Sequence, residues 1–202
     1  QMDILREVHH SQLFRLLALD LAGRLSVEIL ADHLSALADA IVRATVPAAW
    51  HTLATRHCEV PKFAVIAYGK LGGKELGYVS DLDVIFLFDD EHGDAQGLYA
   101  KLAQRFITWM TTHTAAGILF DIDIALRPDG ASGLMVSPYS AFEKYQTESA
   151  WSWDIYAARS ISRTTARTHD NILPGRMREA VDAVRHPTTG LPVCRSTLTN
   201  PT

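Results

Sequence analysis

The first part of the chain has apolar residues at the three- and four-residue spacing of a helix. Over residues 3–22 this spacing predicts one helix, which Gly23 ends. Ser26 is a suitable N-cap for a second helix, because its hydroxyl can accept a free backbone N–H of the first turn. No stretch before residue 61 alternates as a strand does. We therefore predict a helical lead-in over residues 1–60.

The spacing changes at Phe63, where short apolar runs replace the helical pattern. Residues 63–68 and 84–88 are rich in β-branched and aromatic side chains, which is typical of buried strands. A glycine turn and a short helix are expected between them. Helical spacing returns over residues 95–113, where a stripe of leucines and aromatic residues predicts a helix packed on the core.

Polar and apolar residues alternate over residues 118–126, which predicts a third strand with Asp123 on its polar face. A short extended segment is expected at 133–136 and a helix at 139–146. These elements predict an α+β fold in which helices pack on a small mixed sheet, as one domain over residues 61–158.

The apolar pattern is absent from residues 159–202, which are rich in arginine, threonine and proline. We expect this segment to be an atypical tail that is disordered or non-native, or a basic tail that contacts an acidic partner. The segment from Glu148 to about Arg159 is the last one with a clear pattern, and within the tail only Met177–Val184 is a short helical candidate.

Composition sets limits on the class of protein. The 202 residues are 48% hydrophobic and 21% charged, which is ordinary for a globular chain, and the net charge of −4 argues against a nonspecific nucleic-acid binder. Cys58 and Cys194 have no metal-ligand spacing, and no apolar run is long enough for a bilayer. We expect a cytoplasmic protein with neither membrane nor nucleic acid as partner. Because the chain starts at Gln1, we also expect a fragment of something longer.

Candidate chemistry lies at the start of the second strand. Side chains two apart on a strand share a face, so Asp81 and Asp83 point the same way and repel each other without a cation. Hard oxygen ligands at this spacing suit Mg²⁺ or Mn²⁺. An acid/base pair of the glycosidase kind is the alternative, but the two carboxylates are too close for an inverting enzyme.

A third carboxylate is expected from the following strand. Asp123 could lie beside the first two and complete a site for two divalent ions. Asp121 shares its strand face, so spacing alone does not choose between them.

The run Gly69-Lys70-Leu71-Gly72-Gly73 satisfies neither the Walker A nor the dinucleotide-binding spacing. Its backbone N–H groups nevertheless suit a phosphate. Followed by Ser80-Asp81-Leu82-Asp83, the run resembles the nucleotidyltransferase arrangement of the DNA polymerase β superfamily. The resemblance implies that Gly72, Gly73 and Ser80 contact a nucleoside triphosphate.

Three longer stretches, at residues 68–90, 117–137 and 141–153, resemble bacterial glutamine synthetase adenylyltransferase. That family has two related nucleotidyltransferase domains in one long chain. Gly77-Tyr78 and residues 132–137 are similar to its adenylylating half. The resemblance implies that Asp81, Asp83 and Asp123, rather than Asp121, are the catalytic metal ligands. It also implies that Arg127 helps to bind the nucleotide.

The implied reaction is Mg²⁺-dependent transfer of AMP from ATP to a tyrosine hydroxyl of glutamine synthetase, with release of pyrophosphate. The implied partners are glutamine synthetase and a PII-type nitrogen regulatory protein. Two alternatives stay open, which are phosphorolytic removal of AMP and nucleotide binding without turnover. The chain departs from the family at Ala125, where the family has an arginine, and the likeness fades after Trp153.

Overall fold

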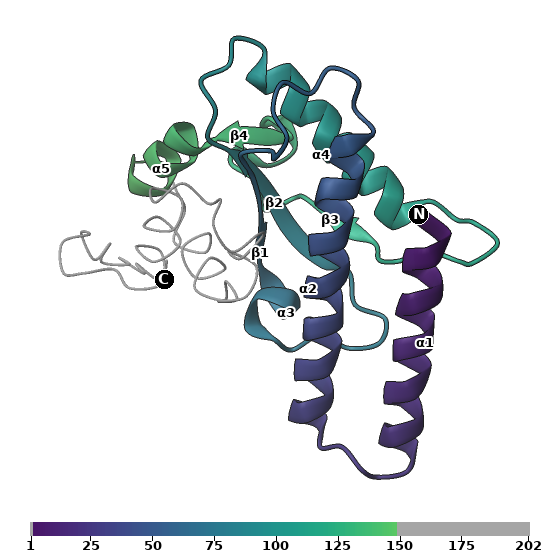
Figure 1. Cartoon of the computed structure of the whole chain (residues 1–202). Helices are drawn as coiled ribbons and strands as arrows, with labels where there is room; N and C mark the ends of the chain where they lie inside the picture. Colours follow the sequence, from purple (N-terminus) through teal and green to yellow (C-terminus); the bar gives the residue numbers. More distant parts are fainter. Residues whose placement is uncertain (1, 149–202) are drawn as a thin grey trace, which may run out of the picture.

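The computed structural model describes residues 2–148, and its elements are arranged as shown in Figure 1. Two long helices, α1 (Met2–Leu21) and α2 (Val27–His51), form an antiparallel hairpin. Gly23 ends α1 with a φ of +63°, and the Ser26 side chain accepts from the N–H of Ile29 at 3.4 Å. The helical pattern expected before residue 61 is confirmed over these two helices.

A four-stranded mixed sheet is built around β2 (Leu82–Phe88). Strand β1 (Phe63–Ala67) pairs with β2 in the antiparallel direction. Strands β3 (Ile122–Asp123) and β4 (Val136–Pro138) both run parallel to β2, with β3 beside its start and β4 beside its end. The predicted α+β class with a small mixed sheet is confirmed.

The third strand is much shorter than the alternating pattern over residues 118–126 predicted. The N–H groups of Leu119 and Phe120 donate to the carbonyl of Met110, at 3.0 and 3.3 Å, instead of to a neighbouring strand. The N–H of Ala125 donates to Asp123 Oδ1 at 2.7 Å. These contacts leave only Ile122–Asp123 to pair with β2.

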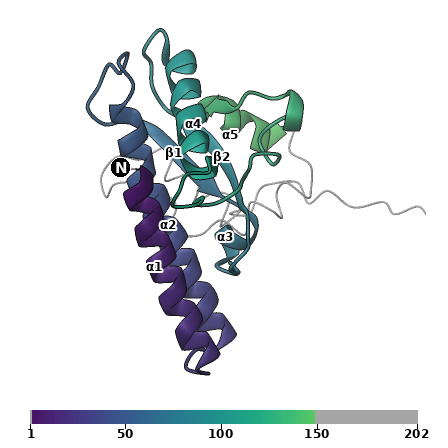
Figure 2. The ribbon, with the colours of Figure 1, turned by 90° about the vertical axis from the view of Figure 1, so that its right-hand side faces the viewer.

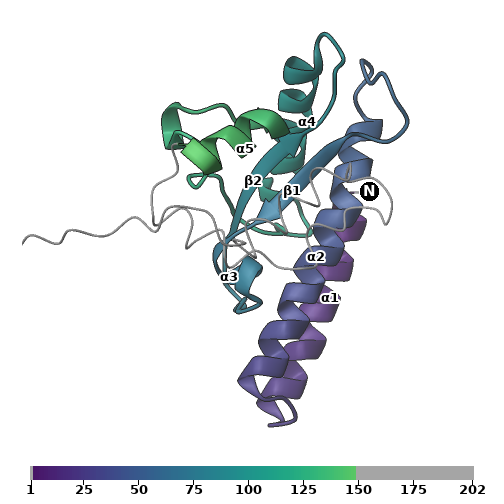
Figure 3. The same cartoon turned by 90° about the vertical axis from the view of Figure 1, so that its left-hand side faces the viewer.

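The sheet lies between two helical layers. Helices α2 and α4 (Ala95–Thr111) cover one face, and α5 (Tyr139–Glu148) lies over the other (Figures 2 and 3). Alternate residues of β2 enter the core shared with α2 and α4, where the largest buried side chains include Trp50, Phe86 and Phe106. The other expected boundaries moved by a few residues: the segment at 133–136 pairs as β4, and the helix at 139–146 continues to Glu148.

A buried arginine joins the first helix to this core. Arg6 is fully buried and donates to the carbonyls of Trp109 at 2.8 Å, Thr112 at 2.6 Å, Gly117 at 2.7 Å and Met2 at 3.1 Å. Two of these carbonyls belong to the end of α4, where helix carbonyls lack partners within the helix. The arginine therefore fixes α1 against the segment that leads into β3. Beyond Glu148, the predicted segment that extends to about Arg159 and the tail at 159–202 lie outside the described residues.

Candidate metal and nucleotide site

The turn between β1 and β2 shapes the site. The short helix α3 (Gly69–Gly73) follows β1, and the N–H of Tyr68 donates to the carbonyl of Asp83 at 2.8 Å. Gly69 has a φ of +54°, and a Cβ built on it would collide with Asp83 Oδ2. Only a glycine lets the Asp83 carboxylate lie against this turn without displacement.

Gly69 is a residue that sequence reasoning missed. The predicted phosphate contacts were Gly72 and Gly73, because the glycine run followed by Ser80-Asp81-Leu82-Asp83 resembles the nucleotidyltransferase arrangement, whereas no separate role was predicted for Gly69. The signal for Gly69 was its place as the first glycine after an apolar strand, but its contact with Asp83 depends on the fold.

Three carboxylates meet at the start of β2. One oxygen each from Asp81, Asp83 and Asp123 lies within 4.8 Å of the other two. Asp83 and Asp123 are register partners across the parallel β2–β3 pair, so their side chains project on the same side of the sheet. Asp81 precedes Asp83 by two positions and shares that face. Asp121 is outside this group, and its carbonyl accepts the N–H of Leu82 at 2.9 Å.

The negative charge of this carboxylate group is poorly balanced. Burial raises the pKa of Asp83, and the neighbouring carboxylates of Asp81 and Asp123 raise it further, while Lys70 opposes them. Within residues 2–148, none of the three aspartates forms an ion pair with a lysine or arginine. Such a cluster of hard oxygen donors fits Mg²⁺ or Mn²⁺. Whether the three residues hold the ion stays a prediction.

The residues predicted to contact nucleotide occupy different environments. The N–H of Gly72 donates to the Tyr68 carbonyl at 2.9 Å, inside α3, whereas Gly73 is exposed. Ser80 Oγ accepts the N–H of Gly77 at 3.0 Å, which leaves its O–H available to donate to a ligand. Their roles in nucleotide binding stay predictions.

Arg127 is engaged by the backbone of its own loop. Its guanidinium donates to the carbonyls of Ile124 at 2.8 Å, Ala131 at 3.1 Å and Gly133 at 3.4 Å. These bonds hold the loop that follows β3, and therefore help to place Asp123. A contact between Arg127 and nucleotide is likewise untested by this geometry.

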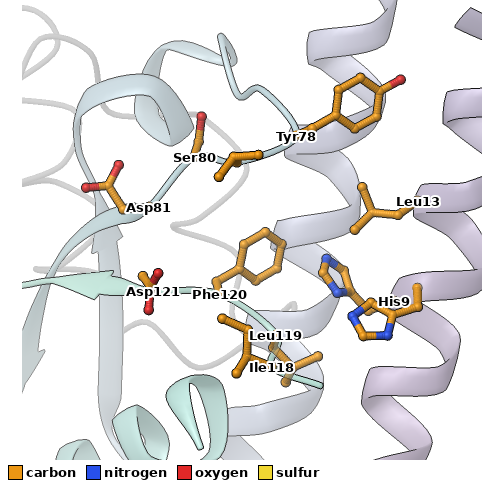
Figure 4. Close-up of a pocket in the computed structure, with 11 residues that line it drawn as sticks. His9, Leu13, Tyr78, Ser80, Asp81, Ile118, Leu119, Phe120 and Asp121 are labelled. Atoms are coloured by element: carbon orange, nitrogen blue, oxygen red, sulfur yellow. The ribbon is translucent and has the colours of Figure 1, made fainter. Parts of the chain in front are cut away.

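A pocket of about 540 Å³ lies beside the carboxylate group, between α1, the loop before β2 and the segment before β3 (Figure 4). The Asp81 carboxylate is directed away from Phe120 and His9 in this view. His9 is buried, and among the described residues neither ring nitrogen has a hydrogen-bond partner. Burial, with His10, lowers the pKa of His9 to about 4, so its ring is neutral at pH 7. Among the described residues, the lining of this pocket contains no lysine or arginine.

Comparison with known proteins identifies the family. Residues 1–171 match the family model described as glutamate-ammonia ligase adenylyltransferase, which is most of the chain. The chain belongs to the glutamate-ammonia ligase adenylyltransferase family. The resemblance expected from the sequence is therefore confirmed, and the family is one of enzymes that transfer a nucleotidyl group.

Curated relatives in this family share more than half of the aligned residues. The chain is 59% identical over 154 residues to the bifunctional glutamine synthetase adenylyltransferase/adenylyl-removing enzyme of Chromobacterium violaceum. It is 56% identical over 158 residues to the Ralstonia nicotianae enzyme of the same name, and 51% identical over 154 residues to that of Neisseria meningitidis.

The alignments cover 76% of this chain but only 16–17% of each relative, so the chain spans about one sixth of their length. Among the helices of residues 2–148, none is both long and apolar enough to cross a membrane.

Proposed function

We propose that this adenylyltransferase-family chain transfers AMP from ATP to a tyrosine hydroxyl of glutamine synthetase and releases pyrophosphate. The observation that carries the proposal is the group of three carboxylates at the start of β2, in a family whose relatives are named for this activity. The acceptor oxygen of the tyrosine forms a bond to the α-phosphorus as its proton passes to solvent. The bond from that phosphorus to the bridging oxygen breaks, and its electron pair leaves with pyrophosphate.

Asp81, Asp83 and Asp123 would hold Mg²⁺, with Mn²⁺ as a possible substitute. When bound, such an ion neutralises phosphate charge and stabilises the charge that develops at phosphorus. Gly69 leaves room for the Asp83 carboxylate, and the Ser80 hydroxyl can donate to a phosphate oxygen. Gly72, Gly73 and Arg127 are the further proposed contacts of ATP.

Phosphorolytic removal of AMP is the second candidate, because the relatives are named for both activities. In that reaction a phosphate oxygen attacks the phosphorus of the AMP–tyrosine ester, the bond from that phosphorus to the tyrosine oxygen breaks, and the products are ADP and the free tyrosine hydroxyl. The adenylylating direction is preferred because Gly77-Tyr78 and residues 132–137 resemble the adenylylating half of the family.

Glutamine synthetase is the proposed partner because the relatives are named for it. A PII-type regulatory protein and a cytoplasmic location remain part of the proposal through the family resemblance alone.

The test is transfer of label from α-labelled ATP to glutamine synthetase in the presence of Mg²⁺. We expect labelling by the parent chain, loss of labelling with Asp81→Asn and Asp83→Asn, and normal labelling with Asp32→Asn, an exposed aspartate on α2. Equal labelling by all four proteins would show that the metal assignment is wrong.

A parallel reaction gives the direction. Adenylylated glutamine synthetase is incubated with phosphate, and ADP is measured. ADP formation without ATP-dependent labelling would favour the removing activity. ATP binding with neither reaction, even at high Mg²⁺ and high protein concentration, would identify a nucleotide-binding fragment without turnover.

A further inference from the structure

A second group of possible ligands lies at the opposite end of β2. One ligand atom each from His57, Cys58 and Asp90 lies within 4.8 Å of the other two. We propose that these three side chains bind a borderline transition-metal ion of the Zn²⁺ type, independently of the carboxylate group at the start of the strand.

The chain brings the three side chains together from two separate segments. His57 and Cys58 belong to the loop between α2 and β1, whereas Asp90 follows the end of β2. His57 Nε2 lies 2.8 Å from Asp90 Oδ2. The Trp50 indole N–H donates to the carbonyl of Cys58 at 3.0 Å and so fixes the backbone of the loop.

Hydrogen bonds also hold Asp90 in place. The Tyr99 hydroxyl donates to Asp90 Oδ2 at 2.7 Å, and the backbone N–H of His92 donates to Oδ1 at 3.2 Å. Carboxylates that bind metals are commonly oriented by such outer partners. The Lys62 ammonium lies 3.6 Å from Oδ1 and would reduce the affinity without blocking Oδ2.

The donor types select the class of metal. Imidazole nitrogen, thiolate sulfur and carboxylate oxygen together suit Zn²⁺ or Co²⁺, whereas Mg²⁺ prefers oxygen ligands. In a tetrahedral zinc site with bonds of about 2.0–2.3 Å, neighbouring ligand atoms are roughly 3.3–3.8 Å apart. The three groups therefore reach that geometry by small side-chain movements. The fourth position would be taken by water.

The bound ion would join the loop after α2 to the end of β2. Strand β2 has 7 residues, so the group of His57, Cys58 and Asp90 is roughly 20 Å from the carboxylate group at the start of the strand. The expected consequence is a more stable fold in the presence of Zn²⁺, with no requirement for ATP.

The test uses the full chain with Cys194→Ser, so that Cys58 is the only thiol. Titration with Co²⁺ should produce a thiolate-to-cobalt charge-transfer band, and added Zn²⁺ should abolish it. Calorimetry should show Zn²⁺ binding that weakens at least tenfold in His57→Gln and in Cys58→Ser. Asp81→Asn should leave the charge-transfer band unchanged, because it alters only the other cluster.

Circular dichroism without metal checks that each variant is folded. Cys58→Ser is the decisive variant if His57→Gln unfolds, because the Cys58 side chain donates only to the nearby Val60 carbonyl, at 3.1 Å. Absence of the cobalt band, or Zn²⁺ affinity unchanged by Cys58→Ser, would overturn the proposal and leave a hydrogen-bonded network only.

Discussion

The two ends of β2 carry aspartates in opposite electrostatic situations. At the start, burial raises the pKa of Asp83, and Asp81 and Asp123 raise it further. At the end, burial also acts to raise the pKa of Asp90, but hydrogen bonds from Tyr99, the His92 N–H and His57 outweigh it and lower the pKa. The difference lies in the neighbours that the fold supplies.

Without metal, the carboxylates at the start of β2 repel one another, whereas the Asp90 carboxylate is stabilised by hydrogen bonds. The group at the start of β2 offers a metal only carboxylate oxygen atoms, and its negative charges are not paired with lysine or arginine among the described residues. Both features favour a hard divalent ion. The Asp90 carboxylate accepts hydrogen bonds from the Tyr99 hydroxyl and the His92 N–H, and it lies beside the His57 imidazole and the Cys58 thiol. We therefore expect the aspartates at the start of β2 to take part in catalysis, and Asp90, just after its end, to stabilise the fold.

The largest expected effect is on catalysis at the start of β2. Asp123→Asn should lower the rate of AMP transfer by about 1000-fold, because it removes a ligand of the proposed divalent ion, whose positive charge would stabilise the transition state. Asp121→Asn is the matched change two residues away, outside the carboxylate group, and should cost less than about tenfold. Steady-state transfer of labelled AMP measures the rate of both variants. Equal losses of rate would show that Asp123 is no more important for catalysis than Asp121.

Gly69→Ala should be the most damaging change to the backbone of the site. The added Cβ collides with Asp83 Oδ2 and is strained at positive φ, so we expect a loss of about 3 kcal/mol in unfolding free energy. Gly93→Ala is the control, because a Cβ there meets nothing within 4 Å. Urea denaturation of both variants provides the measurement. Equal stability would show that the turn can move away from Asp83.

Asp90→Asn should destabilise the protein by about 2 kcal/mol at pH 7, because several donors lose a charged acceptor. The lowered pKa means that the stabilisation is present above the unfolded pKa of about 3.9 and is lost as pH falls through the folded pKa. The deficit of the variant should therefore shrink on acidification. Denaturation curves at several pH values measure it, and a deficit that does not change with pH would contradict the charge-based explanation.

Asp83→Asn should have the smallest effect on stability, and of the opposite sign. Because the pKa of Asp83 is raised in the folded protein, ionisation of its carboxyl group lowers the stability of the fold. This loss of stability is absent below the unfolded pKa of about 3.9 and is complete above the folded pKa. Without metal at pH 7 the variant should gain about 0.5 kcal/mol, a small value because the side chain is only partly buried. Melting curves without and with Mg²⁺ test this, since Mg²⁺ should stabilise only the parent. If Asp83→Asn instead lowers the melting temperature without metal, the ionised Asp83 carboxylate stabilises the fold and the prediction is wrong.

Part of the site followed from local periodicity. Asp81 and Asp83 had to share a face once the apolar run at residues 84–88 was identified as a strand, because side chains alternate with a period of two. The helical hairpin and the α+β class also followed from spacing and capping residues.

The remainder depended on tertiary pairing. Spacing alone left Asp121 and Asp123 open, the family resemblance pointed to Asp123, and the register of β2 and β3 places Asp123 beside Asp83. The alternating pattern over residues 118–126 predicted too long a strand, because the Met110 carbonyl accepts the N–H groups of Leu119 and Phe120. The His57–Asp90 contact joins residues 33 positions apart, so no sequence spacing pointed to it.

Binding of Mn²⁺ to the start of β2 tests the central claim most directly. Calorimetry or electron paramagnetic resonance would compare the parent chain with Asp83→Asn and with the surface control Asp32→Asn. The account requires Mn²⁺ affinity to fall at least tenfold in Asp83→Asn, as expected when a metal ligand is lost, and to stay unchanged in Asp32→Asn. Mn²⁺ affinity that is equal in all three proteins would contradict it.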